Sequence, residues 1–567
     1  MPTECRIRWF LRFSCGTIFL LFLINTGYAA WKATPLEGHY PVDDAFIFVR
    51  YADNILEGNG IAWNPGQSNI YGSTSLSFLL LVTLARAVSP LSVEFTLQLL
   101  TWTCGIFFLI QMAALCRWQG RSWLMRSTSF GFFIVLLIYT TQRAYWWHFL
   151  SGMETTLALL SSALLITAVF WMVRERSTRS VWATAFIGYW CFLTRPDAGL
   201  YATLFPILAL LCWKGWDTKR TIAFYMLAFL GLLCVDTLIK TAVFGSPLPL
   251  PFYAKKNTFH GGFAGYVDWN TMQQVLRGLI MAWLPITLLL VCSKKRDIRL
   301  LIPFLLPYLL HWLYLLSVLQ ITGSYARYYM PGYPFLTLAA LLVLDRRLFE
   351  LEKYDFRWLQ QITYRLSYAG LFLVGISPLF GERLNGLYRK WVLEPVDERN
   401  ERIFPAPRSS LPDLTWEESM VAFGKLLSTL PPGSIAAMSE VGYTGYVAPD
   451  VTIIDVAGLN DPHIATEGFS VNYVLNQKPD LVWLPHYDYA NQVHAFYTSR
   501  KFVDTYLILP GAFKYGIAIR KNSPHATQIL QQVKKLWPEY YGNTPIAIFD
   551  GHGPETNSEK KEKRIYY

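Results

Sequence analysis

Charged residues and cysteine pairs are scarce in this sequence. Only 16% of the 567 residues are charged, 53% are apolar, and the mean hydropathy is +0.27. None of the eight cysteines belongs to a CxxC pair and none follows Cys292, so neither a zinc site nor a disulfide framework is supported. No glycine-rich phosphate loop of the Rossmann or P-loop type is present. The composition excludes an ordinary soluble enzyme, and the missing motifs argue against a nucleotide-bound substrate.

Long apolar runs recur from Phe13 to about Phe380. A helix needs about 20 apolar residues to cross a bilayer, and basic residues concentrate in cytoplasmic loops. Basic loops such as 174–179 and 294–299 therefore place the N-terminus in the cytoplasm. The apolar stretch Ser73–Ser89 would reverse this pattern if it crossed, so we expect it to lie along the outer surface. We predict eleven spans, near 13–31, 92–116, 127–143, 149–173, 181–194, 198–213, 221–243, 273–292, 300–320, 328–344 and 362–380.

The first apolar run admits two interpretations. Arg6, Arg8 and Arg12 precede it and the small residues Gly27 and Ala29 follow, as in a cleaved signal peptide. An uncleaved span is favoured because it tethers the loop that follows. An odd number of spans puts the end of the chain on the extracytoplasmic side, which is the periplasm if the membrane is a bacterial inner membrane.

The character of the sequence changes after the last apolar run. We expect a transmembrane module in 1–381, with 31–91 as its first outer loop carrying interfacial helices. The proline-containing stretch 382–415 is predicted to be a linker, 416–550 a soluble α/β domain, and the charged tail 551–567 disordered. The expected fold class is thus an α-helical polytopic membrane protein with about eleven transmembrane helices and a C-terminal soluble α/β domain.

Short apolar runs between turn residues carry the prediction for that domain. Ser419–Leu430 has the pattern of a helix that ends before Pro431. The predicted strands are Ile435–Met438, Thr452–Val456, Leu481–Leu484 and Tyr515–Ile519.

The adjacent carboxylates Asp43 and Asp44 are the first candidate site. A charged pair beside a bilayer is costly and is a functional-site hypothesis by default. One carboxylate could act as a general base toward a sugar hydroxyl that attacks an anomeric carbon. Its neighbour could orient it, bind a divalent cation or hold the acceptor. The alternative is that Asp43 only caps the helix predicted for Ala45–Leu56 and Asp44 only interacts with its dipole.

Basic residues in three outer loops are the predicted ligands of a donor phosphate. Arg195 lies beside a proline at a helix end, Lys255 and Lys256 follow one span, and Arg327 precedes another. The alternatives are a local Arg195–Asp197 ion pair and charges that only reach toward lipid headgroups. Turn residues and polar residues at span ends complete the list of possible substrate contacts, with structural turns and interhelical hydrogen bonds as their alternatives. These are Tyr71, Ser73, Thr74, His148, Glu154 and Asp197.

Several of these motifs resemble a known superfamily. DDAFIFVRYADNILEGNGIAWNPG is similar to the DDAYI-type opening of the GT-C superfamily of lipid-dependent glycosyltransferases, with Phe46 where the family often has Tyr. SGMETTL, LTRPDAGLY, SPLPLPFYAKKN and SYARYYMPGYP resemble later motifs of that group in the same order. Within the superfamily the chain is similar to arabinofuranosyltransferases that use decaprenyl-phosphoryl arabinofuranose.

The resemblance implies an inverting transfer of a sugar, such as the pentose arabinofuranose, from a polyprenyl-phosphate donor. The acceptor would be a cell-envelope glycan, a glycolipid or a protein at the outer membrane face. By the same resemblance Asp43 is the favoured base, and some members use a divalent cation, which here Asp43 and Asp44 would hold as Mg²⁺ or Ca²⁺.

Two other classes of protein would share this topology. A lipid-linked glycan polymerase or ligase would also have basic outer loops, and only the DDAFI resemblance argues against it. A flippase or transporter should show two similar halves with broken spans, which the sequence lacks. No basic stripe with interleaved aromatic residues indicates nucleic acid.

Overall fold

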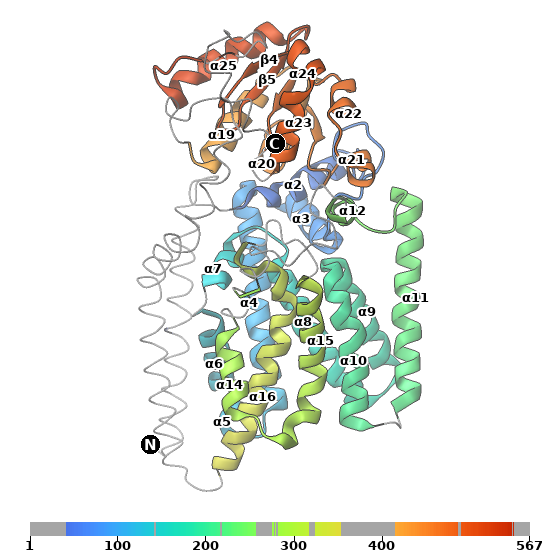
Figure 1. Ribbon diagram of the computed structural model, residues 1–567. Coiled ribbons are helices and arrows are strands. Elements are labelled where there is room, and N and C mark those ends of the chain that lie inside the picture. Colours follow the sequence, from blue (N-terminus) through green and yellow to red (C-terminus); the bar gives the residue numbers. More distant parts are fainter. Residues whose placement is uncertain are drawn as a thin grey trace, which may run out of the picture.

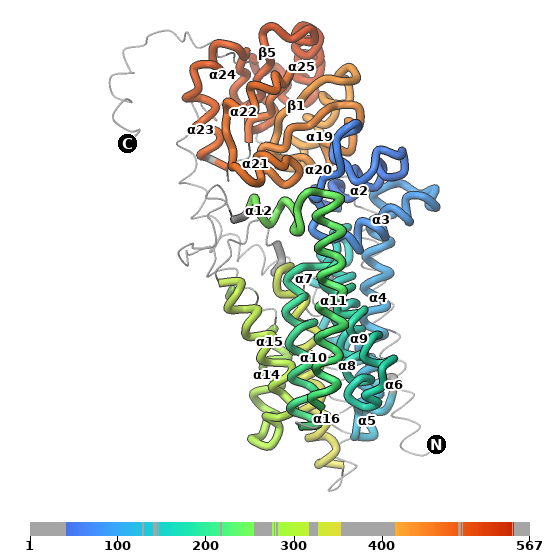
Figure 2. The backbone as a smooth tube through the Cα atoms, turned by 90° about the vertical axis from the view of Figure 1, so that its right-hand side faces the viewer, coloured from blue at the N-terminus to red at the C-terminus, as the bar shows by residue number. Residues whose placement is uncertain are grey.

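Two parts make up the described chain, as Figures 1 and 2 show. A bundle of helices, blue to yellow, lies below a smaller unit of strands and helices in orange and red, called the sheet domain here. The predicted spans near 13–31 and 362–380, nearly all of the linker and the tail lie outside the described residues. The computed structural model describes residues 41–140, 143–215, 218–256, 282–316, 324–352, 414–485 and 489–546, with the single residues 17, 275, 276, 278 and 548.

The long helices of the bundle run side by side, while α2, α3 and α12 lie at the end nearest the sheet domain (Figures 1 and 2). The elements of the bundle are α2 (Asp43–Leu56), α3 (Leu76–Val88), α4 (Val93–Gln119), α5 (Trp123–Arg126), α6 (Thr128–Thr140), α7 (Arg143–Leu150), α8 (Thr155–Glu175), α9 (Thr178–Thr194), η1 (Pro196–Ala198), α10 (Gly199–Lys214), α11 (Lys219–Phe244), α12 (Leu250–Lys256), α14 (Trp283–Cys292), η4 (Lys295–Asp297), α15 (Ile298–Leu316), η5 (Ser324–Gly332) and α16 (Tyr333–Leu351).

Five helical segments are long and apolar enough to cross a membrane, so the chain is a multi-pass helical membrane protein. They correspond to five of the predicted spans, whereas α6 and α14 are apolar but shorter. The predicted total of eleven is therefore not reproduced within the described ranges, which leave out two of the predicted spans. The five segments are Val93–Gln119, Thr155–Glu175, Pro196–Lys214, Lys219–Phe244 and Lys295–Leu316.

Serine caps fix where α3 and α4 begin. The Ser75 hydroxyl accepts the N–H of Phe78, and the Ser92 hydroxyl accepts the N–H of Phe95. Each bond satisfies one of the N–H groups that the first turn of a helix leaves without a partner. Helix α3 has 13 residues, which is too few to span a bilayer. Its placement along the membrane surface stays a prediction.

The sheet domain is built on a five-stranded sheet of order β2-β1-β3-β5-β4. Strand β1 is parallel to both of its neighbours, β2 and β3. Strand β5 is antiparallel to both of its neighbours, β3 and β4. Its strands are β1 (Ile435–Met438), β2 (Thr452–Asp455), β3 (Leu481–Trp483), β4 (Tyr506–Leu509) and β5 (Ile517–Arg520). Its helices are α19 (Trp416–Leu427), α20 (Gly442–Tyr446), α21 (Pro462–Glu467), α22 (Val471–Asn476), α23 (Ala490–Thr498), α24 (Arg500–Thr505) and α25 (Ala526–Tyr541).

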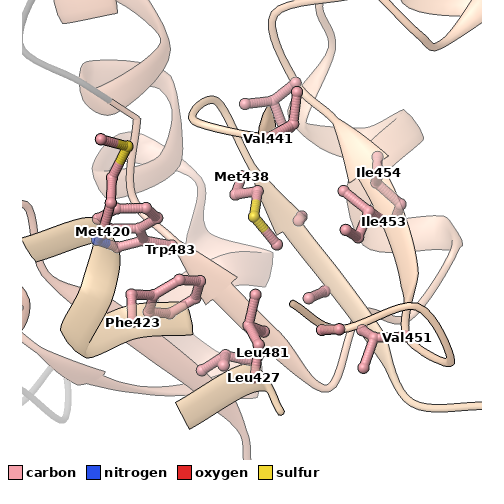
Figure 3. Close-up of a cluster of buried hydrophobic side chains, with 14 of the residues drawn as sticks. Met420, Phe423, Leu427, Met438, Val441, Val451, Ile453, Ile454, Leu481 and Trp483 are labelled. Carbon is pink, nitrogen blue, oxygen red and sulfur yellow. The ribbon is translucent and has the colours of Figure 1, made fainter. Parts of the chain in front are cut away.

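Strands are found at all four predicted places, with ends that differ by up to two residues. Strand β4 was missed, because its four residues follow α24 directly and only pairing with β5 identifies them as a strand. The core forms where α19 covers the sheet (Figure 3). There the Phe423 ring stacks on Trp483 of β3, with 4.3 Å between ring centroids.

Helix α2 joins the bundle to the sheet domain, and Arg50 makes several hydrogen bonds across this joint. This side chain is 4% exposed. Its guanidinium donates to the carbonyls of Gly445, of Ala448 at 3.1 Å and of Val451 at 2.9 Å, and to Oδ1 of Asn64 at 3.0 Å. Burial lowers the pKa of Arg50 to about 10. The cation is satisfied mainly by backbone dipoles of the other domain, which fixes the two parts together.

Asn64 extends the sheet from the bundle side. Its Oδ1 accepts the N–H of Ile453 at 2.8 Å, and its Nδ2 donates to the carbonyl of Ile453 at 3.0 Å. The amide thus pairs with edge strand β2 as another strand would. The Tyr51 hydroxyl adds a hydrogen bond to Oδ1 of Asn460 at 3.0 Å.

Replacing Arg50 by Lys should loosen the sheet domain from the bundle. A lysine keeps the charge but cannot reproduce the planar set of donors, and each hydrogen bond to a charged group is worth about 1.5–3 kcal/mol. We expect faster amide exchange in β2 and α20, with unchanged exchange in α8 and α9. Arg86→Lys is the control, because Arg86 pairs with Asp53 at the exposed side of α2. Equal exchange in wild type and Arg50→Lys would contradict this account.

Candidate functional site

Asp43 is directed at the sheet domain. The N-cap of α2 is Val42, whose side chain makes no cap bond, so Asp43 is the first residue inside the helix. Its Oδ1 accepts the N–H of Tyr443 at 2.7 Å and its Oδ2 accepts the N–H of Gly442 at 3.1 Å. The structural alternative was that Asp43 caps its own helix. The carboxylate instead binds the N–H groups at the start of α20.

The environment of Asp43 is tight and dry. A Cβ at Gly442 would lie 2.0 Å from the Asp43 carbonyl oxygen, so only glycine fits there. Burial raises the pKa of Asp43 to about 8 from an ordinary 3.8, the nearby Glu440 carboxylate adds to the shift, and the two N–H bonds offset part of it. Asp43 is thus committed to the contact between the two parts of the chain.

The turn between α7 and α8 holds the other side of α2. The N–H of Val42 donates to the carbonyl of Ser151 at 3.0 Å. Gly152 has a φ of +72°, and a Cβ there would lie 3.1 Å from Cβ of Ala45, so this turn approaches α2 as only glycine permits. Glu154, which is 1% exposed, follows directly. The turn thereby brings a buried carboxylate beneath the start of α2.

Arg195 binds two carboxylates at once. Its Nη1 donates to Oε1 of Glu154 at 2.9 Å, while Nε and Nη2 donate to the two oxygens of Asp197 at 3.1 and 2.9 Å. Burial disfavours the cation, but the carboxylates of Asp197 and Glu154 outweigh it and raise the pKa of Arg195 above its ordinary value. The local Arg195–Asp197 pair, expected as an alternative, is present, and Glu154 joins it.

Arg327 enters the same cluster from η5. Its Nη1 lies 3.2 Å from Oδ2 of Asp44. Both cations lie near the ring of Tyr328, with 5.5 Å from its centroid to Cζ of Arg195 and 5.6 Å to Cζ of Arg327. Among the described residues, the buried Nε of Arg327 and Oε2 of Glu154 have no hydrogen-bond partner. We call Asp44, Glu154, Arg195, Asp197, Arg327 and Tyr328 the arginine cluster.

Tyr71 lies at the joint between the first loop and α11–α12. The carbonyl of Tyr71 accepts the N–H of Leu250 at 2.7 Å, and its ring stacks on Phe244 at 5.0 Å between centroids. Ser73 is buried, and Thr74 is partly exposed. The contacts of Tyr71 are structural, and they bring the loop to α12 rather than to the arginine cluster.

The remaining candidates are placed only in part. His148 is fully buried at the end of α7, just before the turn that holds α2. Lys255 and Lys256 belong to α12, which contacts α21 of the sheet domain. The side chains of both lysines lie outside the described residues. Of the predicted site residues, the structure gathers Asp44, Glu154, Arg195, Asp197 and Arg327.

Three residues of this region escaped the sequence prediction. Tyr328 lies within the quoted motif YARYYMP but was not singled out. His311 and Tyr201 are each 1% exposed inside the bundle, and His311 Nε2 lies 3.5 Å from Oδ2 of Asp197. A histidine within an otherwise apolar span was the available signal for His311. Tyr201 gave none, because a tyrosine among apolar residues is ordinary in a helical bundle.

No group of three or more His, Cys, Asp or Glu side chains is arranged to hold a metal ion among the residues that the structure describes. Asp43 accepts two N–H groups of the sheet domain and Asp44 is paired with Arg327. The two carboxylates thus have different protein partners, and a divalent cation held by this pair stays a prediction.

Comparison with known proteins finds a family match for part of the chain and a similar fold among solved structures. Residues 413–530 match a family described as a domain of unknown function (DUF8728). No curated protein sequence matches the chain. The chain has the fold of ArnT from Cupriavidus metallidurans, whose crystal structure was determined bound to undecaprenyl phosphate. The TM-score is 0.51 and the sequence identity 11%, over 89% of this chain and 98% of the other.

The Asp43 contact should weaken as pH rises. Between about pH 4 and about pH 8 the folded carboxyl keeps a proton that the unfolded one has lost, so stability falls with pH in that window. We expect the melting temperature of wild type to decrease across this range more than that of Asp43→Asn. Burial also raises the pKa of Asp455, to about 7. The contribution of Asp455 is the same in both proteins, so the difference between the two curves reports Asp43 alone. Asp53→Asn is the control and should keep the wild-type slope; parallel curves for wild type and Asp43→Asn would refute the assignment.

Proposed function

We propose that the protein is a glycosyltransferase that moves a sugar from a polyprenyl-phosphate donor to a hydroxyl acceptor. The observation that carries the proposal is the arginine cluster, in which the guanidiniums of the buried Arg195 and the nearly buried Arg327 both lie within 5.6 Å of the centroid of one tyrosine ring. Such a concentration of buried charge is expensive at a membrane surface and is characteristic of a functional site.

The cluster is suited to a phosphate group. Guanidiniums are the preferred partners of phosphate because their donors match its oxygens. The Nε of Arg327 is a buried donor with an open hydrogen-bond position, and Oε2 of Glu154 is a buried acceptor with one. We assign the donor phosphate to Arg327 and Arg195, and a sugar hydroxyl to Glu154. Lys255 and Lys256 remain candidates for the same phosphate.

Two comparisons support a lipid-linked donor. ArnT, whose fold this chain has, was crystallised with undecaprenyl phosphate. The motifs that resemble the GT-C glycosyltransferases contain all six cluster residues, namely Asp44, Glu154, Arg195, Asp197, Arg327 and Tyr328. A pentose such as arabinofuranose is the sugar we favour, from the same resemblance, and a cell-envelope glycan, glycolipid or protein is the acceptor.

Asp44 is the better base of the pair in this arrangement. Asp43 is buried against two N–H groups of the sheet domain, whereas the Asp44 side chain is 30% exposed and touches the cluster. In the free protein Asp44 is held by Arg327. A donor phosphate that binds Arg327 would compete for the guanidinium and release the carboxylate for proton transfer.

The reaction is then a single displacement. Asp44 removes the proton of the acceptor hydroxyl, whose oxygen forms a bond to the anomeric carbon as the bond from that carbon to the phosphate oxygen breaks. The polyprenyl phosphate leaves with the bonding electron pair, and fixed positive charge stabilises it. Attack opposite to the leaving group inverts the anomeric centre.

The distribution of basic residues in the loops indicates on which side of the membrane the reaction takes place. The basic residues that favour the cytoplasm in our span assignment lie at the far end of the bundle from the cluster, for example those of 294–299. We therefore place the cluster and the sheet domain outside the cytoplasm and the N-terminus inside, in a bacterial inner membrane.

Replacing each of the two carboxylates in turn by asparagine distinguishes their roles. Asp44→Asn should lower turnover by about 10²–10⁴-fold, the usual contribution of a general base, with polyprenyl phosphate still bound. Asp43→Asn should have a smaller effect that follows the loosening of the sheet domain. Turnover is measured as release of polyprenyl phosphate from a panel of polyprenyl-phosphate sugars. A larger loss in Asp43→Asn than in Asp44→Asn would reverse the assignment, and no release from any donor by wild type would reject the proposed function.

Removing Arg327 tests the phosphate site without turnover. Arg327→Ala should weaken binding of undecaprenyl phosphate by about 10- to 100-fold, the equivalent of one or two charge-assisted hydrogen bonds. Binding is followed by tryptophan fluorescence in detergent. Arg86→Ala, which removes a more exposed arginine of α3, should bind as wild type does. Wild-type affinity in Arg327→Ala would remove the phosphate from this cluster.

A further inference from the structure

A line of buried polar groups continues from Arg195 into the bundle. Asp197, which takes two hydrogen bonds from Arg195, lies on η1. Behind it, His311 of α15 places Nε2 at 3.5 Å from Oδ2 of Asp197. The other ring nitrogen, Nδ1, is 3.0 Å from the hydroxyl of Tyr201 on α10. The imidazole thus lies between a carboxylate and a phenol. It is hydrogen-bonded to the phenol, whereas its Nε2 lies within ion-pair distance of the carboxylate and makes no hydrogen bond among the described residues.

What sets the Tyr201–His311 pair apart from an ordinary buried tyrosine is its contact with Asp197, the carboxylate that binds Arg195. Both His311 and Tyr201 are 1% exposed, and burying polar groups costs free energy unless they are hydrogen-bonded. Two apolar residues at these positions would pack without that cost. The retained polar contacts end on the carboxylate that orients Arg195, which connects them to the cluster.

Tyr201 also lies at the end of the segment that carries the second arginine. A Cβ at Gly332, the last residue of η5, would lie 2.0 Å from the Tyr201 hydroxyl oxygen. The backbone of η5 therefore rests directly on this hydroxyl, and η5 carries Arg327. Tyr201 thus contacts His311, which lies beside the Asp197 that binds Arg195, and it also contacts the segment that carries Arg327.

We propose that Tyr201 and His311 are positioning residues for the donor phosphate. His311 restrains Asp197, so the Asp197 carboxylate keeps the Arg195 guanidinium in one orientation. Tyr201 sets the tautomer of His311 by its hydrogen bond and fixes the end of η5. A guanidinium held in advance loses less conformational freedom when a ligand binds. This inference rests on the proposed function and predicts an effect on affinity for the phosphate group rather than on the chemical step.

The bundle offers a matched control for Tyr201. Tyr225 of α11 is also fully buried, and its hydroxyl also bonds to α10, at the carbonyl of Ala202. That hydrogen bond does not lead to Asp197. Removing either hydroxyl should perturb packing to a similar extent, but only the Tyr201 hydroxyl belongs to the line that ends at Arg195.

The experiment compares Tyr201→Phe, His311→Leu, His311→Gln and Tyr225→Phe in the full chain. For Tyr201→Phe and His311→Leu we expect the KM for the polyprenyl-phosphate sugar and the Kd for undecaprenyl phosphate to rise about tenfold, the effect of about one lost hydrogen bond. kcat should change by less than about threefold, because these groups do not touch the reacting atoms. His311→Gln, which can donate to Asp197 and accept from Tyr201, should restore most of the affinity. Tyr225→Phe should bind as wild type does.

Wild-type KM and Kd in a folded Tyr201→Phe would overturn the inference, as would an equal loss in Tyr225→Phe. If His311→Leu does not fold, Tyr201→Phe decides, since it removes a single oxygen atom. Arg195→Lys is measured in parallel to separate this inference from the proposed function. If Arg195→Lys weakens phosphate binding while Tyr201→Phe does not, only the positioning role is wrong. If neither changes binding, Arg195 is not a phosphate ligand and both assignments fail together.

Discussion

The two consecutive carboxylates at the start of α2 face different partners, and this holds the helix in place. An α-helix turns by about 100° per residue, so Asp43 and Asp44 leave α2 in different directions. Asp43 reaches the N–H groups that open α20, and Asp44 reaches Arg327 on η5. The helix is thereby held between the sheet domain and the bundle. The position of Asp44, which we propose as the base, therefore depends on the structural contact that Asp43 makes.

The described chain buries arginines in two ways, and the difference separates structure from function. Arg50 fills its donor positions with carbonyls and an amide of fixed segments, which leaves little for a ligand to gain. Arg327 keeps a buried Nε without a hydrogen-bond partner, and next to it Glu154 keeps an open carboxylate oxygen. Burying polar atoms in that state is unfavourable unless something supplies the missing bonds. A phosphate and a sugar hydroxyl would supply both.

The sheet domain contributes to the site by holding it rather than by lining it. It contacts Arg50 and Asp43 of α2 and Asn64 of the loop that follows. Its helix α21 contacts α12, which carries Lys255 and Lys256. Two outer segments that are distant in the sequence therefore share one rigid support. A short helix such as α12 has little stability of its own, so its placement depends on such tertiary contacts.

The amino-acid sequence alone determined that the chain is a helical membrane protein with a terminal α/β unit, because apolar length and strand periodicity are local properties. It also located four of five strands and named Asp44, Glu154, Arg195, Asp197 and Arg327 as candidates. It ranked Asp43 above Asp44, and it missed β4, Tyr201, His311 and Tyr328. Only the tertiary structure shows where these residues lie, since hydrogen bonds between residues about 400 positions apart, such as Asp43 to Tyr443, leave no local pattern. Whether a buried charge is filled or open depends on which distant groups the fold brings beside it.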